Sequence, residues 1–349
     1  MLKDEWTRAA DDLFRRTVIV IPVYLTESIP FAQGRDLVER TVASCVREVE
    51  RPASVCLSAD GPGPGEAVAE DLSRVYGVRL VRSDRNRGKL AGVRAGVSHM
   101  LEADGCRDCR YVAALDMDGD HFANELLNFL RAAAQVRAVT GRDRTLVLGR
   151  RVSRHRPMGF VRGELEELAD RILLDALQYD AAVCGKPLAL QFTTSHGALP
   201  DLHSGYKVFT RRTAADVFLQ PPRPAGLSEE AYYRHAVEAV MCVEAIKSGA
   251  MLAEVGRSTF DEQPVSAFGS LERVALFRDK ILWPCRRLEV PPPFVAQWID
   301  NHLPRLLLGT VVPDGVNEML ELRRRVLEAL GQAEEPTRRP EGIVRAPFL

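Results

Sequence analysis

The chain has 349 residues and a formal net charge of −1 at pH 7. This length suits one large domain or two smaller ones. The near-zero net charge argues against a protein that binds nucleic acid through bulk electrostatics, so we expect no nucleic-acid partner.

The seven cysteines are an odd number and are scattered along the chain, which favours a reducing compartment over a disulfide scaffold. No apolar stretch approaches the ~18 residues that a membrane-spanning helix needs. The charged amino terminus also lacks the apolar core of a secretion signal. We therefore expect a cytoplasmic protein without a transmembrane segment, for which peripheral membrane contact stays open.

Strands and helices alternate through the first half of the chain. Apolar, β-branched runs predict strands at 17–24, 53–59, 78–81, 111–115 and 146–149. Helical spacing of apolar residues predicts helices at 3–16, 36–50, 66–76, 86–103 and 122–136. We expect Pro22 to end the first strand, because proline cannot donate to a central ladder. The alternation predicts an α/β fold with a mostly parallel sheet flanked by helices.

The second half is less regular. Short strands and loops are expected over 186–209, and one further strand over 250–255. Helices are predicted at 162–183, 210–218, 228–248, 271–283, 294–308 and 315–330. The residues from 332 onward are polar and rich in proline, which is typical of a flexible tail.

An acidic stretch, LDMDGDH, follows the expected strand at 111–115. If the strand geometry continues, Asp116, Asp118 and Asp120 point to the same side and converge at its carboxyl end. Open α/β sheets bind their ligands at that edge. Three close carboxylates repel one another unless a cation joins them, and hard oxygen ligands suit Mg²⁺ or Mn²⁺. The alternative is a solvated acidic turn, because Asp and Gly are common turn residues.

Five other motifs accompany this stretch in a fixed order. They are VIPVY at 20–24, DG at 60–61, DRNRGKLAG at 84–92, VLGRR at 147–151 and DLHSGYKVF at 201–209. The series resembles the GT-A nucleotide-sugar glycosyltransferases of family 2 type, and among them the dolichyl- and polyprenyl-phosphate sugar synthases. The similarity extends over roughly residues 17–268.

The resemblance implies a Rossmann-like GT-A domain over residues 1–268. Its nucleotide-sugar half would be 17–150 and its acceptor half 151–268. A helical C-terminal extension over 269–331 and the tail at 332–349 would follow.

The resemblance also implies a nucleotide-binding set. Pro22, Val23 and Tyr24 would line the nucleotide pocket at the end of the first strand. Asp60 would accept a hydrogen bond from the base, although an Asx turn before Gly61 is the alternative. Arg87 and Lys89 would face the nucleotide at a helix N-terminus, which itself favours anions. The alternative for these two is a basic helix start on the surface.

In the acidic stretch, the resemblance implies that Asp116, Met117 and Asp118 hold the sugar nucleotide. Asp116, Asp118 and Asp120 would bind the metal, with Asp118 as the direct ligand. Asp120 departs from the family pattern, in which this position often holds glutamine. His121 matches the family histidine and would stack on the donor or hydrogen-bond to it, although a half-buried loop histidine is an equal reading.

Further along the chain, the resemblance implies that Arg150 reaches the donor phosphates, which suits its planar fork. Asp201, Ser204 and Gly205 would make acceptor-side and phosphate contacts. Glu238 falls where many relatives carry the catalytic base, but the sequence VEA lacks their acidic pair. The alternative for Glu238 is a helix-surface glutamate.

These features predict a metal-dependent glycosyltransferase. It would move a sugar from a UDP- or GDP-sugar to an unidentified small-molecule or lipid-phosphate acceptor, with inversion by resemblance, and a homodimer is compatible with the sequence. A nucleotidyltransferase that makes a sugar nucleotide is one rival, but it would want a glycine-rich basic loop where the chain has YLTESIP at 24–30. A catalytically inactive GT-A binding or scaffold protein is the other rival, and the three aspartates argue against it.

Overall fold

The computed structural model describes residues 2–153, 155, 159–193, 199–259, 272–307 and 313–332. The chain forms two compact units. The first consists of residues 1–152, 189–222 and 240–260, and the second of residues 153–188, 223–239 and 261–349.

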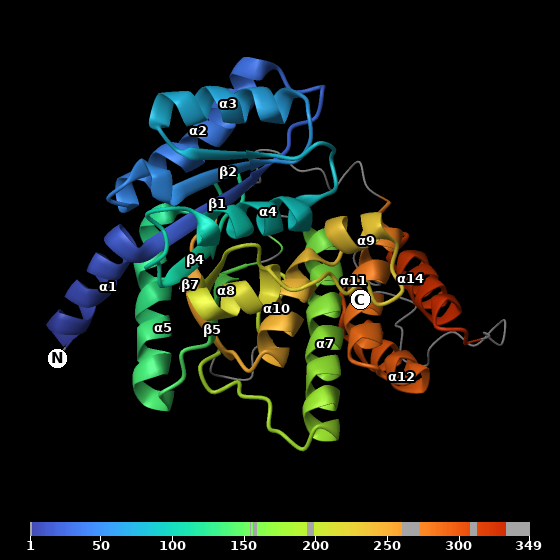
Figure 1. Ribbon diagram of the computed structural model, residues 1–349. Coiled ribbons are helices and arrows are strands. Elements are labelled where there is room, and N and C mark those ends of the chain that lie inside the picture. Colours follow the sequence, from blue (N-terminus) through green and yellow to red (C-terminus); the bar gives the residue numbers. More distant parts are fainter. Residues whose placement is uncertain are drawn as a thin grey trace. The chain divides into compact units, whose positions relative to one another are not determined.

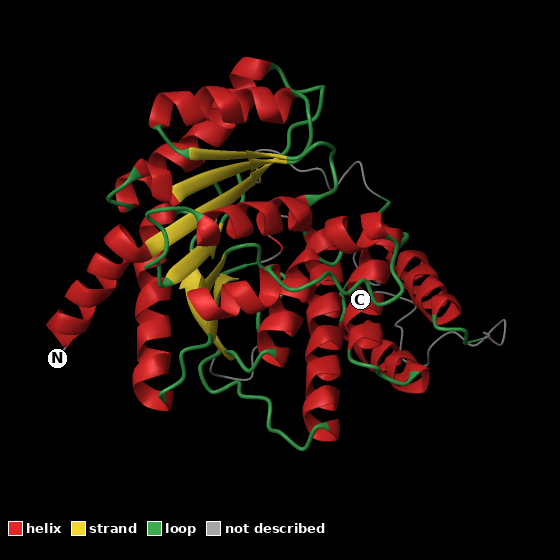
Figure 2. Ribbon diagram, viewed as in Figure 1, coloured by secondary structure: helices red, strands yellow, loops and turns green. Residues whose placement is uncertain are grey.

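The first unit is built on a seven-stranded sheet with the order β3-β2-β1-β4-β6-β5-β7 (Figure 2). The strands are β1 (Thr17–Val23), β2 (Val55–Ala59), β3 (Arg79–Arg82), β4 (Tyr111–Ala114), β5 (Thr145–Arg151), β6 (Lys207–Thr210) and β7 (Met251–Arg257). Strand β6 runs antiparallel to both of its neighbours, and every other neighbouring pair is parallel. The expected α/β fold with a mostly parallel sheet is therefore confirmed.

Helices cover both faces of this sheet. In Figure 1, α2 and α3 lie on one face of β1 and β2, and α4 lies on the other. The helices of this unit are α1 (Leu2–Arg16), α2 (Phe31–Glu48), α3 (Pro64–Tyr76), α4 (Lys89–Glu102), α5 (Leu126–Thr140) and α8 (Arg211–Phe218), with short 3-10 turns at Pro52–Ser54 and Ala123–Glu125. The central strands are buried on both sides, which explains their continuous apolar sequences.

The strand order reverses beside β1. The chain lays down β1, β2 and β3 side by side in one direction and then returns to place β4 on the other side of β1. Such a reversal is a topological switch point, and the loops that follow β1 and β4 diverge from it. Any ligand site at this edge is bordered by the residues after Val23 and after Ala114.

The expectation that Pro22 ends the first strand is wrong, because β1 continues to Val23. Pro22 pairs with Ser58 of β2, whereas the register with β4 ends at Val20 and Ala114. The missing N–H of Pro22 therefore lies beyond the β4 ladder, where a central strand tolerates it.

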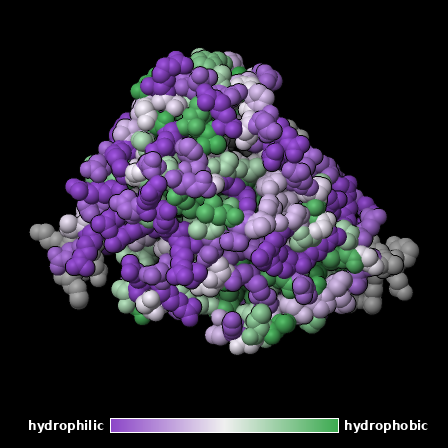
Figure 3. Space-filling model, viewed as in Figure 1, coloured by the Kyte–Doolittle hydropathy of each residue, from purple (hydrophilic) through white to green (hydrophobic). Residues whose placement is uncertain are grey.

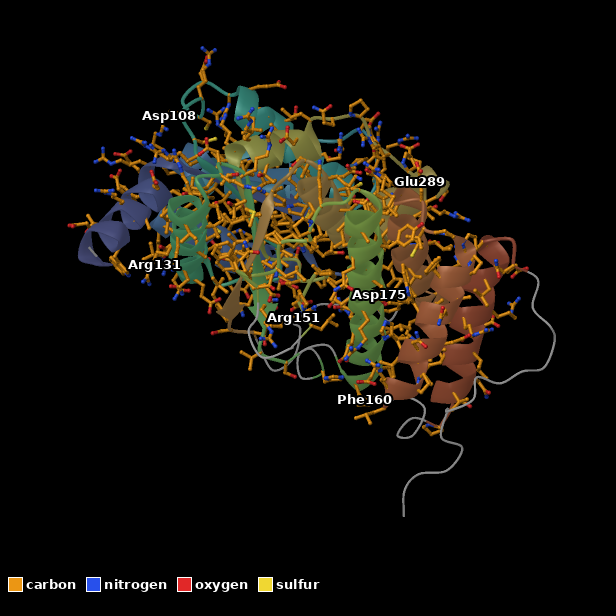
Figure 4. All side chains as sticks on the ribbon, turned by 90° about the horizontal axis from the view of Figure 1, so that it is seen from below. Asp108, Arg131, Arg151, Phe160, Asp175 and Glu289 are labelled. Atoms are coloured by element: carbon orange, nitrogen blue, oxygen red, sulfur yellow. The ribbon has the colours of Figure 1, made fainter. Side chains whose placement is uncertain are left out.

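The described part of the second unit is helical. It contains α7 (Phe160–Val183), α9 (Glu229–Arg234), α11 (Arg273–Arg287), α12 (Pro292–His302), a 3-10 turn at Leu303–Arg305 and α14 (Gly315–Ala329). The long helix α7 packs against α11 and α12. Figure 4 labels Phe160 at the start of α7 and Asp175 along its length.

These units do not follow the boundaries expected from the sequence. Residues 153–188 and 223–239 were expected with the sheet, but they lie with the C-terminal helices. The reason is that α7 buries its apolar stripe and packs against α11 and α12.

The single helix expected over 228–248 is two helices. The first, α9, ends at Arg234, and the second, α10 (Val237–Lys247), spans the boundary between the units at residues 239 and 240. The expected N-cap is confirmed, because the Ser228 side chain accepts a hydrogen bond from the Ala231 amide.

Polar and charged residues cover most of the face drawn in Figure 3, where apolar residues form small groups. Among the helices that the structure describes, none is both long enough and apolar enough to cross a membrane.

Candidate functional site

The acidic stretch is a turn rather than a continued strand. Strand β4 ends at Ala114, and the chain then bends through Gly119, which has a φ of +80°. Strand alternation therefore stops before the first aspartate, and the three carboxylates turn toward different partners. The expectation that they converge is wrong: within the described ranges, no group of three acidic, histidine or cysteine side chains is arranged to hold a metal ion.

Asp116 is paired with the first residue of α4. Its Oδ1 lies 2.7 Å from Lys89 Nζ, and each of the two side chains is 30% exposed. Burial alone would raise the pKa of Asp116, but the charge and hydrogen bond of Lys89, together with the nearby His121 and Arg257, lower that pKa well below the usual range. Asp116 is therefore ionised, and Lys89 supplies its counter-charge.

Asp118 has a different environment two residues later. Among the described residues, its carboxylate accepts one hydrogen bond, from the Asp120 amide at 3.2 Å. Partial burial and the neighbouring negative charge of Asp116 raise the pKa of Asp118 to about 6. This side chain is the acidic group of the turn that would gain most from a bound cation.

Asp120 is buried and paired with β7. It is 3% exposed, and its Oδ2 lies 3.1 Å from the guanidinium of Arg257, which is equally buried. The same guanidinium also donates to the Asp120 backbone carbonyl and to that of Ser258. The expectation that Asp120 binds the metal therefore has no geometric support, because an arginine already neutralises it.

The donor set fits Mg²⁺ or Mn²⁺ only in a reduced form. A cage of three carboxylates is absent from the described residues, for the reasons given above. Mg²⁺, however, is commonly held by one or two carboxylates together with substrate phosphates and water. Asp118, which carries a raised pKa, and the half-exposed Asp116 match that smaller set.

His121 is buried next to Asp116 and contacts its backbone. It is 3% exposed and stacks on Tyr206, with ring centroids 4.7 Å apart. Its Nδ1 accepts a hydrogen bond from the Asp116 amide at 2.8 Å, so the remaining proton of the neutral ring is on Nε2. Burial lowers the pKa of His121 well below its ordinary value, and the ring is neutral at pH 7. Its role here is to position Asp116.

Gly205 lies directly against the Lys89–Asp116 pair. A Cβ at this position would be 2.7 Å from Asp116 Oδ2, 3.1 Å from Lys89 Nζ and 3.2 Å from His121. A larger residue here would press on the two charged groups, because the backbone approaches them closely. Gly205 therefore lies beside the acidic turn, while its predicted acceptor-side and phosphate contacts stay predictions.

The loop that carries Gly205 is held by buried polar contacts. Asp201 is 1% exposed and receives Arg151 Nε at 2.8 Å and the outer guanidinium nitrogen at 2.6 Å. Ser204 is also buried and donates to the Gly149 carbonyl at 2.6 Å. The ammonium of Lys207, which is fully buried, donates to the carbonyls of Leu202 and Ser204.

Three residues that were predicted to contact the ligands lie in or beside this loop: Asp201, Ser204 and Arg150. Asp201 and Ser204 fix the loop, and neither side chain is exposed to a ligand. Arg150 is half-buried and precedes Arg151, which is labelled in Figure 4. Because strand residues alternate in direction, Arg150 points away from the Asp201 pair. Its contact with donor phosphates stays a prediction.

Asp60 joins the end of β2 to the start of α4. Its two carboxylate oxygens accept hydrogen bonds from the backbone amides of Arg87 at 2.9 Å and Gly88 at 2.7 Å. Asp60 is only 4% exposed, so it shapes the loop that precedes Lys89. Its predicted bond to a nucleobase stays untested.

The remaining predicted nucleotide contacts are spread over the same edge. Val23 is buried at 1% exposure, whereas Tyr24 is 46% exposed and Pro22 is half-buried. Met117 is fixed through its carbonyl, which accepts from Thr41 of α2 at 3.0 Å. Arg87 is exposed and lies 3.6 Å from Asp84.

Glu238 lies in the first turn of α10 and belongs to the second unit. Its role as a base therefore stays a prediction. Sequence reasoning did not find Arg257 or Arg151, the two buried partners of the aspartates. Arg257 is 137 residues from Asp120 in the chain, and no local pattern indicates such a pair.

Comparison with known proteins adds no assignment. No protein-family model matches the chain, and no curated protein matches it either.

Proposed function

We propose that the chain is a metal-dependent glycosyltransferase that uses a UDP- or GDP-sugar as donor. One observation carries the proposal: Lys89, Asp116 and Asp118 lie together at the carboxyl edge of a mostly parallel sheet, beside the switch point between β1 and β4. A cationic group at a helix N-terminus next to half-exposed carboxylates suits a diphosphate bridged by a divalent cation.

Each group has a distinct part in this proposal. Lys89 and the first amides of α4 bind the diphosphate, because the helix N-terminus carries partial positive charge. Asp118 and Asp116 would hold Mg²⁺ or Mn²⁺, which when bound neutralises the charge that builds on the departing nucleoside diphosphate. His121 keeps Asp116 in place, and Gly205 leaves room for the two charged side chains.

The acceptor side is proposed on the sequence resemblance. The acceptor would be a small molecule or a lipid phosphate, and the transfer would invert the anomeric centre through an oxocarbenium-like state. An acceptor hydroxyl needs a base, for which Glu238 is the candidate, whereas a phosphate acceptor needs none. A cytoplasmic location, peripheral membrane contact and a homodimer belong to the same proposal.

A thermal-shift screen tests the donor site. The protein is heated with UDP, GDP, ADP and their sugar derivatives, each with and without Mn²⁺. Because a ligand that binds only the folded state stabilises it, by about 2.7 kcal/mol at a hundred times Kd, we expect UDP or GDP to raise Tm and to do so more strongly with Mn²⁺.

Two variants serve as controls. Asp118→Asn should lose the Mn²⁺-dependent part of the shift, whereas Asp104→Asn, whose side chain is 92% exposed, should keep it. If no nucleoside diphosphate raises Tm under any of these conditions, the proposed function is wrong and the scaffold reading takes its place.

A further inference from the structure

In the proposed function, Lys89 binds the diphosphate and Asp116 binds the divalent cation, yet the two side chains form an ion pair with each other. Lys89 Nζ lies 2.7 Å from Asp116 Oδ1. The other oxygen of Asp116 lies 3.8 Å from Nε2 of His121. Asp116 thus already has a cation, and Lys89 already has an anion.

Each ligand on its own meets an obstacle at this pair. A divalent cation that approaches Asp116 is repelled by the Lys89 ammonium, and a diphosphate that approaches Lys89 is repelled by the Asp116 carboxylate. When both arrive, the ammonium turns to the phosphate and the carboxylate to the cation. Two favourable contacts then replace the one that is lost.

The geometry allows Lys89 to move and keeps Asp116 in place. Lys89 is 30% exposed and has a long flexible side chain, whereas the backbone of Asp116 is fixed by the buried His121 ring. Asp120 offers a contrast, because its partner Arg257 is 3% exposed and donates to three oxygens. Of the two cationic partners in the acidic turn, Lys89 can therefore leave its carboxylate more readily than Arg257 can.

We propose that the Lys89–Asp116 pair makes the binding of the nucleoside diphosphate and of the divalent cation depend on each other. This inference rests on the proposed donor site and deepens it. Thermodynamic linkage requires the dependence to be reciprocal, so the nucleotide raises the affinity for Mn²⁺ by the same factor by which Mn²⁺ raises the affinity for the nucleotide. Coupling factors of about 5 to 150 are typical of such systems.

Removal of Lys89 gives a counter-intuitive prediction. In Lys89→Met, Asp116 and Asp118 are left beside each other without the ammonium, so the variant should bind Mn²⁺ alone at least about fivefold more tightly than the wild type. Its affinity for the nucleotide should fall. The factor by which UDP or GDP enhances Mn²⁺ binding should shrink toward the value that direct Mn²⁺–phosphate coordination provides.

The experiment is a titration of Mn²⁺ followed by electron paramagnetic resonance and by calorimetry, with and without UDP or GDP. Lys89→Gln is a second variant in case Lys89→Met folds poorly. Arg82→Met is the matched control, because it also removes one positive charge from an ion pair, in this case with Glu66 at 3.3 Å. The control should keep the wild-type Mn²⁺ affinity and the wild-type coupling factor.

A Lys89→Gln or Lys89→Met protein that binds Mn²⁺ no more tightly than the wild type overturns the inference, even where the wild type binds a nucleotide. The inference is also overturned if the double variant Lys89→Met/Asp116→Asn binds Mn²⁺ as tightly as Lys89→Met does, because the gain in affinity would then not come through Asp116. A wild type that binds neither UDP nor GDP with any cation is a separate result, which contradicts the proposed function, while the nucleotide-free Mn²⁺ titrations still test the effect of Lys89 on Asp116.

Discussion

Two kinds of acidic residue border the same edge of the sheet. Asp120 and Asp201 are each at most 3% exposed and lie against a buried arginine. Asp116 and Asp118 are half-buried; Asp116 is paired with a lysine whose side chain is 30% exposed, and the pKa of Asp118 is raised. Burial and the type of the paired cation therefore distinguish the two kinds of carboxylate.

The buried pairs hold the site in shape. Arg151 on β5 and Asp201 on the loop before β6 join the segment that carries Gly205 to the sheet. Arg257 on β7 fixes the far end of the acidic turn through Asp120. A buried ion pair adds little net stability compared with an apolar pair, but loss of one partner leaves an unpaired charge in the interior.

The largest expected effect comes from breaking a buried pair. Arg151→Met should lower the free energy of unfolding by about 3–5 kcal/mol, because the Asp201 carboxylate stays buried without its guanidinium. Urea denaturation followed by circular dichroism measures this change. The double variant Arg151→Met/Asp201→Leu should recover most of the loss, since it removes both charges.

The neighbouring arginine provides a matched control. Arg150→Met changes the same residue type on the same strand, but the side chain is half-buried and points to the other side of the sheet. We expect a change below about 1 kcal/mol. Equal losses for Arg150→Met and Arg151→Met would mean that the buried pair is not what distinguishes the two regions.

Around Asp116 and Lys89, we expect an added side-chain atom to affect ligand binding more than stability. Gly205→Ala adds a Cβ that meets Asp116 Oδ2 at 2.7 Å and Lys89 Nζ at 3.1 Å. The Lys89 side chain is flexible, and the Asp116 carboxylate can rotate although its backbone is fixed, so the free energy of unfolding should change by less than about 1 kcal/mol. The affinity for a nucleoside diphosphate with Mn²⁺, measured by calorimetry, should fall about tenfold, which is about 1.4 kcal/mol.

Gly256→Ala is the control for this substitution. Gly256 lies in β7, and no atom is within 4 Å of the Cβ that it would gain. Its nucleotide affinity should match that of the wild type. The prediction is contradicted if Gly205→Ala lowers the free energy of unfolding by several kcal/mol while the folded protein keeps the wild-type affinity for the nucleotide.

The sequence was sufficient to predict the elements that depend on local pattern. The β-branched run at 17–24 and the helical spacing at 162–183 correspond to β1 and α7 because each pattern is set by a single element. The assignment of α7 to the second unit was not foreseeable, since it depends on packing against α11, which begins 90 residues after α7 ends (273 − 183).

The candidate site divides in the same way. Lys89, Asp116 and Gly205 come from three of the sequence motifs and lie close together in the structure, while their predicted ligand contacts stay predictions. The prediction that three aspartates converge was wrong because it extended strand alternation past Ala114, where the strand ends and a turn begins. The role of Asp120 depends on Arg257, which the chain brings in from another strand.

The smallest expected effect concerns the pH dependence of Asp118. Its pKa in the folded protein is about 6, above the ordinary value of 3.8, so the folded state holds this proton more tightly than the unfolded state. Well below pH 3.8 the group is protonated in both states and carries no penalty. Between the two pKa values the unfolded state releases the proton while the folded state keeps it, so stability falls as the pH rises, and the loss is complete above the folded pKa of about 6, where Asp118 is ionised beside Asp116.

Asp118→Asn should therefore be more stable than the wild type by roughly 1 kcal/mol at pH 7.5, a value reduced for partial exposure, with a much smaller difference near pH 4. Urea unfolding from pH 4 to pH 8 in the presence of a chelator measures the difference. Asp104→Asn, at a side chain that is 92% exposed, should stay within about 0.5 kcal/mol of the wild type throughout. A variant that is less stable than the wild type at pH 7.5, or a difference that does not vary with pH, would place Asp118 with the structural carboxylates. A carboxylate that destabilises the protein in the presence of a chelator is instead what a cation-binding position requires, because a bound ion relieves the same repulsion.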